Sequence, residues 1–233
     1  MTPRFDRTLI PPAPNFEFEV NLWAQGYYIV AGVDEAGRGS LAGPVAAGAL
    51  VFPNDASLLP GLFGVRDSKQ MTPQSRSYWA ERLKAESLAW GVGFASAGEI
   101  DALGILPATR LAACRAVQSL NVEPDYLLID YLELPELPIP QTPLVKGDMR
   151  SLSIAAASIL AKTARDALMR ELEAQYPGYG LARHKGYATA DHRLTLERLG
   201  PSAIHRLSFS PVRFSSLLAS FPEEERRPVH ETQ

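Results

Sequence analysis

Three short apolar segments of this chain each end at or just before a carboxylate. Residues 28–34 read Tyr-Ile-Val-Ala-Gly-Val-Asp, residues 126–130 read Tyr-Leu-Leu-Ile-Asp, and another apolar segment precedes Asp148. Apolar runs of this length are typical of strands that are buried inside a sheet. Open α/β sheets usually carry their sites at the carboxyl ends of strands. The pattern therefore predicts a sheet with Asp34, Asp130 and Asp148 at its functional edge.

Strand patterns alternate with helix patterns along the rest of the chain. Strands are predicted at 28–34, 44–52, 89–95 and 126–130 and before Asp148, and helices at 16–25, 72–88, from 96 onward, 107–120 and 153–175. Two helix starts are well marked, because Thr72-Pro73 supplies an N-cap followed by proline and Ser96 with Glu99 forms a capping box. Early strands in close succession, followed by alternation, indicate one α/β domain with a single mixed sheet.

The two ends of the chain differ in composition from its middle. The first residues are rich in proline, and the last dozen, from Pro222, carry a charged run followed by polar residues. We therefore predict an N-terminal extension over 1–28, a main domain over 29–215 and a solvated C-terminal tail over 216–233.

Composition excludes several classes of protein. Apolar residues make up 46% and charged residues 21% of 233 residues, as in an ordinary soluble globular protein. Cys114 is the only cysteine, lies in an apolar helical run and is expected to be a small buried hydrophobe. We expect a cytoplasmic protein, since no intramolecular disulfide can form and no apolar run has the length of a signal core or a membrane span. A net charge of −3 argues against recognition of nucleic acid mainly by global charge.

The stretch Val33-Asp-Glu-Ala-Gly-Arg-Gly-Ser-Leu-Ala-Gly-Pro44 places two adjacent carboxylates before a turn that contains three glycines. Neighbouring side chains of a regular strand face opposite sides, so Asp34 and Glu35 would converge only if the strand ended there. Glycines permit such a bend and the close approach of a ligand, and Arg38 lies between two of them. A solvated turn with an ordinary Arg-Glu surface pair is the alternative.

Asp130 and Asp148 complete a possible set of four carboxylates, although each could also be a cap or turn residue. Carboxylate oxygens are preferred by Mg²⁺ and Mn²⁺, and nucleases often hold two such ions close together. No nucleophile elbow and no metalloprotease spacing of histidines is present, and one cysteine excludes a cysteine-based zinc site.

Taken together, these motifs resemble the bacterial ribonuclease HII family. The resemblance covers about residues 28–215 and includes the acidic glycine stretch, Asp67-Ser-Lys69, Leu128-Ile-Asp130, Val145-Lys-Gly-Asp148, the run 156–162 with Arg165-Asp166, and His184-Lys-Gly-Tyr187. It implies a ribonuclease H-like fold with a central five-stranded mixed sheet flanked by helices, and a C-terminal helical region. It also implies hydrolysis of RNA in RNA/DNA hybrids, and cleavage 5′ of ribonucleotides embedded in duplex DNA, with two Mg²⁺ or Mn²⁺ ions. The expected ends are a 5′-phosphate and a 3′-hydroxyl.

The resemblance also implies roles for individual residues. Asp34, Glu35, Asp130 and Asp148 would be the catalytic metal ligands. The segment Gly37-Arg38-Gly39 would contact the 2′-hydroxyl at an RNA-to-DNA junction, which fits the fact that this group distinguishes RNA from DNA. Tyr187 would stack on the following deoxyribose, although it could instead anchor a loop.

Other polar residues are expected to have less direct roles. Ser158, Lys162 and Asp166 recur every four residues on one helix face. We expect Ser158 and Lys162 beside the site and a structural role for Asp166, with a Lys162–Asp166 surface pair as the alternative. Further candidate phosphate contacts, each of which could equally be a solvated loop charge, are Lys69, Lys146, His184, Lys185 and Arg206.

The chain departs from the family pattern at Ser40, where proline is usual, and at Tyr131-Leu132, where Gly-Asn is common. These changes are expected to loosen the turn and to make the loop after Asp130 bulkier. A binding module for hybrid duplexes that does not cut is the main rival, and a phosphotransferase with an aspartyl nucleophile is another. The second rival is disfavoured because Ala36 stands where a second aspartate is needed. We expect a monomer.

Overall fold

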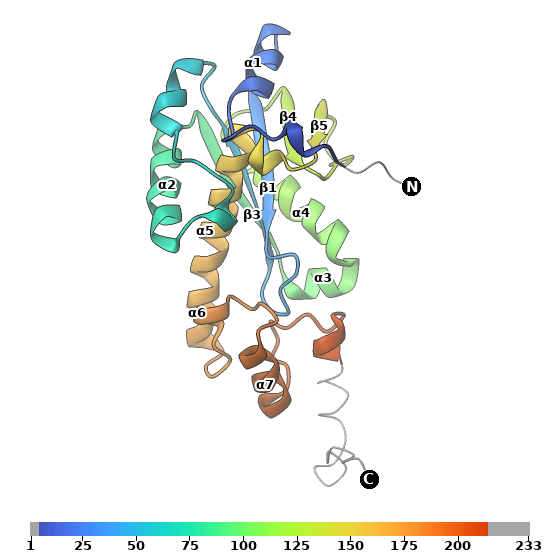
Figure 1. Ribbon diagram of the computed structural model, residues 1–233. Coiled ribbons are helices and arrows are strands. Elements are labelled where there is room, and N and C mark those ends of the chain that lie inside the picture. The colour runs from blue at the N-terminus through green and yellow to red at the C-terminus, as the bar shows by residue number, and fades with distance from the viewer. Residues whose placement is uncertain (1–4, 214–233) are drawn as a thin grey trace.

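The computed structural model describes residues 5–213, in which the expected strands form one five-stranded mixed sheet (Figure 1). The strands are β1 (Val30–Ala36), β2 (Val45–Val51), β3 (Ala89–Ala95), β4 (Tyr126–Asp130) and β5 (Gln141–Leu144). Their order across the sheet is β3-β2-β1-β4-β5. Strand β2 runs antiparallel to both β1 and β3, whereas β1, β4 and β5 run parallel to one another. The expected mixed sheet is confirmed.

The helices lie close to their predicted positions. They are α1 (Glu17–Ala24), α2 (Pro73–Glu86), α3 (Ala97–Leu103), α4 (Ile105–Gln118), α5 (Leu152–Gln175), α6 (Leu181–His184) and α7 (Ala190–Leu199). The side chain of Thr72 caps α2, and Ser96 and Glu99 form the expected capping box of α3. Gly104, with φ of +85°, separates α3 from α4. Short 3₁₀ turns connect several elements.

Glycines in the strands let two helices lie very close to the sheet. A side chain on Gly32 of β1 or on Gly48 of β2 would overlap the backbone of α5, and one on Gly91 or Gly93 of β3 would overlap the backbone of α4. The two helices therefore cover opposite faces of the sheet, α5 over β1 and β2 and α4 over β2 and β3. This close packing of α5 brings its polar face to the carboxyl end of β1.

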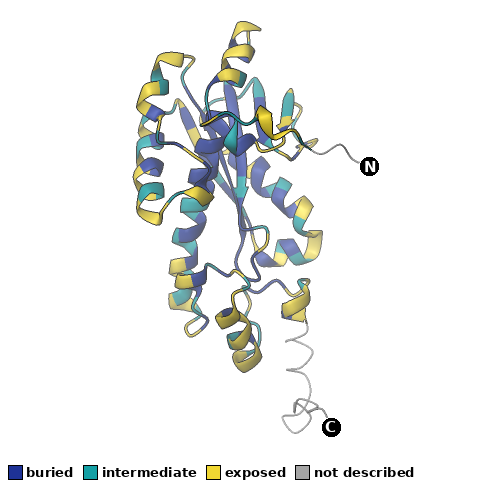
Figure 2. Cartoon of the chain, in the orientation of Figure 1, coloured by how far each residue is buried: buried dark blue, intermediate teal, exposed yellow. Residues whose placement is uncertain are grey.

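The apolar core has one layer on each face of the sheet. The layer under α4 includes Val33, Ile129 and Cys114, so Cys114 is the small buried hydrophobe expected. The layer under α5 includes Leu50, Leu128 and side chains of α1 and α2. The strands at the centre of the sheet are buried along most of their length, whereas the outward faces of α2 and α3 are exposed (Figure 2).

Residues 16–24 of the predicted N-terminal extension pack onto the sheet domain. Phe16 and Trp23 belong to the core layer under α5, and the predicted helix at 16–25 is present as α1. The carboxylate of Glu19 is buried and accepts hydrogen bonds from the hydroxyls of Ser151 and Ser153 and from the Ser153 backbone N–H, at 2.7, 2.6 and 2.9 Å. These contacts tie α1 to the start of α5.

The C-terminal helical region lies at the end of the molecule where α5 finishes (Figure 1). Helices α6 and α7 pack there on a third apolar cluster that includes Leu41, Met169 and Val212. The predicted tail at 216–233 lies outside the described residues. Among residues 5–213, no helix combines the length and hydropathy that a membrane span requires.

Candidate active site

Three of the predicted acids converge at the carboxyl end of β1 and β4. In the parallel pair, Val33 lies opposite Ile129, so Asp34 and Asp130 follow directly on neighbouring strands. Asp148 joins them from the 3₁₀ turn Gly147–Met149 that follows β5. One carboxylate oxygen from each of the three lies within 4.8 Å of the others. The Gly147 N–H donates to Oδ1 of Asp130 at 2.7 Å and so fixes the turn that carries Asp148.

Burial and mutual repulsion make this acid cluster electrostatically unfavourable by itself. Burial, followed by the charges of Glu35 and Asp130, raises the pKa of Asp34 well above its usual range. Burial and the charge of Asp148 raise the pKa of Asp130 to about 6. Oδ2 of Asp34 is buried without a hydrogen-bond partner among the described residues. The exposed Lys69 supplies a cation, with Nζ 3.5 Å from Oδ2 of Asp148.

Glu35 does not join the cluster, because β1 does not end at Asp34. The strand continues to Ala36, and its pairing with β2 continues to the same residue. The Glu35 carboxylate instead accepts from Nη1 of Arg38 at 3.2 Å. The Arg-Glu pair that we considered as an alternative is thus present, but the Glu35 side chain is only 14% exposed, so it is not an ordinary surface pair.

The glycine loop after β1 forms one wall of a cavity of about 250 Å³ beside the acids. Gly37, Arg38 and Gly39 line it together with Lys162 and Tyr187. Gly37 has φ of +91°, which favours glycine. At Gly39, no atom of the described part of the chain lies within 4 Å of the place where a side chain would begin. These residues, which are predicted to contact the substrate, therefore border one cavity.

Two buried arginines hold the glycine loop from beneath. Arg165 donates to the carbonyl oxygens of Pro44, Lys185 and Ala42 at 2.9, 3.0 and 3.1 Å. Arg206 donates to the carbonyl oxygens of Gly43, Arg38 and Gly37 at 3.0, 2.7 and 2.8 Å.

The prediction that Arg206 is a phosphate contact or a solvated charge is wrong, since its side chain is fully buried and its guanidinium donates to backbone carbonyl oxygens. Sequence reasoning missed the supporting role of both arginines. The sequence around Arg165 is itself polar, with Lys162 and Thr163 before it and Asp166 after it, so it carried no local signal of a buried arginine.

The polar stripe of α5 lies beside the site. The Ser158 hydroxyl is buried 2.8 Å from that of Ser68, and Ser158 opposes the rise in the pKa of Asp34. Lys162 Nζ lies 2.6 Å from Asp166, so the ion pair considered as the alternative is present, although both side chains are largely buried. The same Nζ lies 5.3 Å from the ring of Tyr187, at the cavity. Lys162 therefore combines the structural pair with a position at the candidate site.

The remaining candidate phosphate contacts divide into exposed and buried residues. Lys69 and Lys146 are exposed next to the acids, and Lys185 is partly exposed. His184 is buried, with Nε2 2.7 Å from the Tyr179 carbonyl oxygen and Nδ1 accepting from the Gly186 N–H at 3.1 Å. The prediction of a phosphate contact at His184 is wrong, because both ring nitrogens are engaged by the backbone.

The departures from the family pattern have local consequences. Ser40 is fully buried, and its hydroxyl has no partner among the described residues. Tyr131 is 67% exposed with φ of +61°, which leaves a large ring in solvent directly after Asp130. Leu132 turns inward and joins the core layer under α4.

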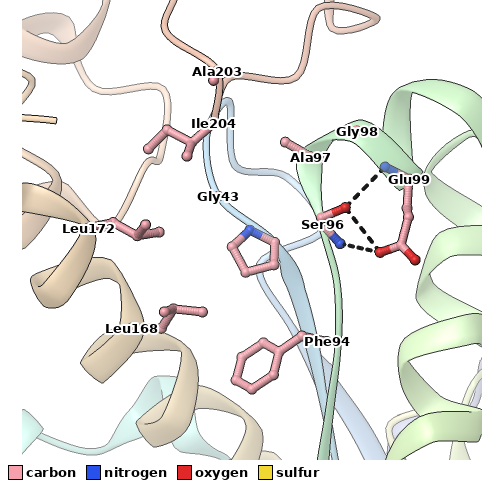
Figure 3. Close-up of a pocket in the computed structure, with 11 residues that line it drawn as sticks. Gly43, Phe94, Ser96, Ala97, Gly98, Glu99, Leu168, Leu172, Ala203 and Ile204 are labelled. Carbon is pink, nitrogen blue, oxygen red and sulfur yellow. Dashed lines mark hydrogen bonds between the residues drawn. The ribbon is translucent and has the colours of Figure 1, made fainter. Parts of the chain in front are cut away.

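A larger hollow lies on another part of the surface and contains none of the acids. Its volume is about 560 Å³, and Figure 3 shows Phe94, Leu168, Leu172 and Ile204 around it, with the capping box of α3 at one side. An apolar lining without a cluster of acids does not fit a metal or a phosphate. The candidate active site is therefore the smaller hollow, whose lining includes the charged residues Glu35, Arg38, Lys69 and Lys162.

Comparison with known proteins agrees with this geometry. The family model of ribonuclease HII matches residues 31–212, which contain the acid cluster, the glycine loop and the cavity. The chain belongs to the ribonuclease HII family. A curated ribonuclease HII of Synechococcus sp. is 55% identical over 201 residues, covering 86% of this chain and 90% of that protein. Family membership makes the chain a ribonuclease H endonuclease.

Solved structures support the same fold. The ribonuclease H2 of Pyrococcus horikoshii has a TM-score of 0.67 and 26% identity, covering 81% of this chain and 97% of that one. Bst-RNase HIII in complex with Mn²⁺ has a TM-score of 0.64 and 20% identity, covering 83% of this chain and 71% of that one. The second likeness is one of fold alone.

Proposed function

We propose that this enzyme cuts the RNA strand of RNA/DNA hybrids and also cuts 5′ of ribonucleotides embedded in duplex DNA, leaving a 5′-phosphate and a 3′-hydroxyl. The observation that carries the proposal is the convergence of Asp34, Asp130 and Asp148 beside the glycine loop. The acids can hold metal ions that act on a phosphate, and the adjacent glycine loop lets a sugar approach its backbone closely. Cleavage and recognition of the sugar can therefore take place at one site. Monomeric action and a cytoplasmic location remain predictions.

The acid cluster fits hard divalent cations such as Mg²⁺ or Mn²⁺. Three carboxylates lie within a few ångströms of one another, and burial and the charge of Asp148 raise the pKa of Asp130. Within residues 5–213, one buried oxygen of Asp34 has no hydrogen-bond donor. Carboxylate oxygens are the ligands that these ions prefer. When bound, two such ions would activate a water and stabilise the leaving oxygen. Asp34, Asp130 and Asp148 would hold these ions, and Glu35 would take part from its place beside Arg38.

The loop and the cavity supply the means to read the sugar. Gly39 has open space around it, so a ribose can approach its backbone closely. Arg38 stands at the same wall, and Tyr187 presents a ring that is 37% exposed and lies 5.3 Å from Lys162 Nζ. We assign the 2′-hydroxyl to Gly37-Arg38-Gly39, the following deoxyribose to Tyr187, and adjacent phosphates to Lys162 and Lys69. Ser158 would hold Asp34 in place from the buried side.

The test is Asp34→Asn, assayed on labelled duplexes with one, four or many ribonucleotides, in Mg²⁺ and in Mn²⁺. The substitution removes the central charge while keeping the shape of the side chain, so cleavage of every duplex should be lost. Asp55→Asn is the matched control, because Asp55 is exposed and caps a 3₁₀ turn outside the cluster. Unchanged cleavage by Asp34→Asn would overturn the assignment.

A further inference from the structure

Three histidines form a buried group behind Tyr187. His184 ends α6, His192 lies in the first turn of α7, and His205 lies in the segment after α7; their exposed fractions are 8%, 0% and 2%. The rings of His184 and His192 are stacked with centroids 4.2 Å apart, and those of His192 and His205 are 5.3 Å apart. Neither the acid cluster nor the cavity beside it includes these residues.

The hydrogen bonds of this group define a direction. The backbone N–H of Ser202 donates to Nδ1 of His205 at 3.0 Å, so Nδ1 is the acceptor and Nε2 carries the hydrogen. That Nε2 lies 3.1 Å from Nε2 of His192, which must then accept. The hydrogen of His192 is therefore on Nδ1, which donates to the backbone carbonyl oxygen of Tyr187 at 3.0 Å. Each neutral ring has one tautomer that satisfies both of its contacts.

The surroundings of His192 and His205 favour the neutral form of both rings. Burial and the neighbouring His192 lower the pKa of His205 to about 4, and burial also lowers the pKa of His192. A proton added to Nε2 of His192 would face the N–H of His205 Nε2, and a proton added to Nδ1 of His205 would face the backbone N–H of Ser202. The stacked His184 engages the same turn, since its Nδ1 accepts from the N–H of Gly186.

The segment that carries His205 also contacts the glycine loop. His205 pairs with Ala42 in an isolated antiparallel bridge, and the next residue, Arg206, donates to the carbonyl oxygens of Gly37 and Arg38. The Leu41 N–H donates to the carbonyl oxygen of Gly186, one residue before Tyr187. The two walls of the candidate site are thus connected through the segment that carries His205.

We propose that His205 and His192 are positioning residues. Their hydrogen bonds link the backbone of Ser202 to the carbonyl group of Tyr187, and they thereby hold the Tyr187 ring at the RNA-to-DNA junction, opposite the glycine loop. The proposal rests on the proposed function, because it takes Tyr187 as the residue that packs on the following deoxyribose. An apolar core could fill the same volume, but it would not fix the Tyr187 carbonyl from this side. The carbonyl also accepts from the Thr189 N–H at 2.8 Å, so His192 supplies its second donor.

The tautomers give a test that is independent of activity. Histidine labelled with ¹⁵N is observed by NMR in the full chain at neutral pH. The expected result is a hydrogen on Nδ1 for His192 and on Nε2 for His205. A hydrogen on Nε2 of His192 would overturn the proposal, since that ring could not donate to Tyr187.

A matched pair of variants tests the role in recognition. In His192→Asn the side-chain amide can replace the Nδ1 donor, whereas in His192→Gln it reaches the Nε2 position and leaves Tyr187 without this donor. On a duplex with one ribonucleotide, His192→Gln should lower kcat/KM about tenfold and His192→Asn about twofold or less. Thermal unfolding of both variants checks that they fold alike. Equal losses in the two variants would contradict the proposal.

The link to Tyr187 is tested by a double-mutant cycle. If His192 acts through Tyr187, adding His192→Gln to Tyr187→Ala should change kcat/KM less than twofold or so, because the ring that it positions is already absent. A second tenfold loss in that background would show a role elsewhere and overturn the proposal. Failure of the proposed function would look different, because Asp34→Asn would then leave cleavage unchanged whatever the tautomers are.

Discussion

Gly37 and Arg165 lie in direct contact where β1 passes into the glycine loop. A methyl group on Gly37 would overlap the guanidinium of Arg165, and φ at Gly37 is +91°. The guanidinium cannot withdraw without releasing the carbonyl oxygens of Pro44, Ala42 and Lys185. The loop that borders the acids is therefore shaped by the close fit of one glycine against one buried arginine.

The glycines of this loop should respond differently to alanine. Gly37→Ala should lower the free energy of unfolding by at least about 2 kcal/mol, since it meets both the contact with Arg165 and an unfavourable φ. The methyl group of Gly39→Ala enters open space, so the free energy of unfolding should change by less than about 0.5 kcal/mol. The same variant should lower kcat/KM at least about tenfold, because the substrate approaches the backbone at this position. Urea unfolding and cleavage assays measure the two effects. A stable, fully active Gly39→Ala would show that the ribose is read elsewhere.

Without metal, Asp130 should cost stability at neutral pH. Burial and Asp148 raise its pKa to about 6, above its ordinary value of 3.8, so the folded state holds the proton more tightly. The stabilisation that this bound proton gives the folded state is fully present below about pH 4 and is lost as the pH rises through 6. Asp130→Asn, which keeps the oxygen that accepts from Gly147, should stabilise the metal-free protein at pH 7 by roughly 1–3 kcal/mol and abolish cleavage.

The measurement is urea unfolding in a chelator at pH 7 and pH 4, where the gain should shrink at the lower pH. Added Mg²⁺ should stabilise the wild type more than the variant. An Asp130→Asn protein that is less stable than the wild type at pH 7 would contradict the electrostatic argument.

His205 should make the fold sensitive to mild acid. Its pKa is lowered from 6.5 to about 4 by burial first and by His192 second, so the unfolded chain binds its proton more tightly. The stabilisation is complete above about pH 6.5 and is lost as pH falls toward 4, by up to about 3 kcal/mol. The other ionisable groups that face the ring are His184 and Tyr179, and Arg206 follows it in the chain.

The check is the difference between wild type and His205→Gln, because contributions from other groups cancel in it. The glutamine keeps a donor toward His192 but does not titrate. The variant should therefore lose less stability than the wild type between pH 6.5 and pH 4. Parallel curves over this range would assign the acid sensitivity to other residues.

Glu19 should reveal whether the N-terminal extension unfolds together with the domain. Glu19→Ala removes the acceptor of three hydrogen bonds from Ser151 and Ser153 and should cost about 2–4 kcal/mol in a single unfolding transition. Glu19→Gln retains an oxygen acceptor without a buried charge, and it should be close to the wild type in stability at pH 7. A separate early transition in either variant would show that the extension is an independent unit.

The sequence determined the elements and the identity of the acids. Periods of apolar residues, the Ser96–Glu99 capping box and the proline after Thr72 are local signals, and the helices and strands appear within a few residues of the predictions. Parallel pairing of two acid-bearing strands then brings Asp34 and Asp130 together, because the register places the residues before them side by side.

Only the tertiary structure decided which polar residues face substrate and which support the backbone. Arg206 and His184 looked like surface charges in the sequence. In the structure both are buried: Arg206 donates to carbonyl oxygens far away in the chain, and the ring of His184 is engaged by the nearby backbone of Tyr179 and Gly186. Glu35 was expected within the cluster, and it lies outside because β1 continues past Asp34 to pair with β2. The local amino-acid sequence indicates which chemistry a residue can perform. Its partner is set by long-range packing, since an unpaired buried polar group is too costly to remain.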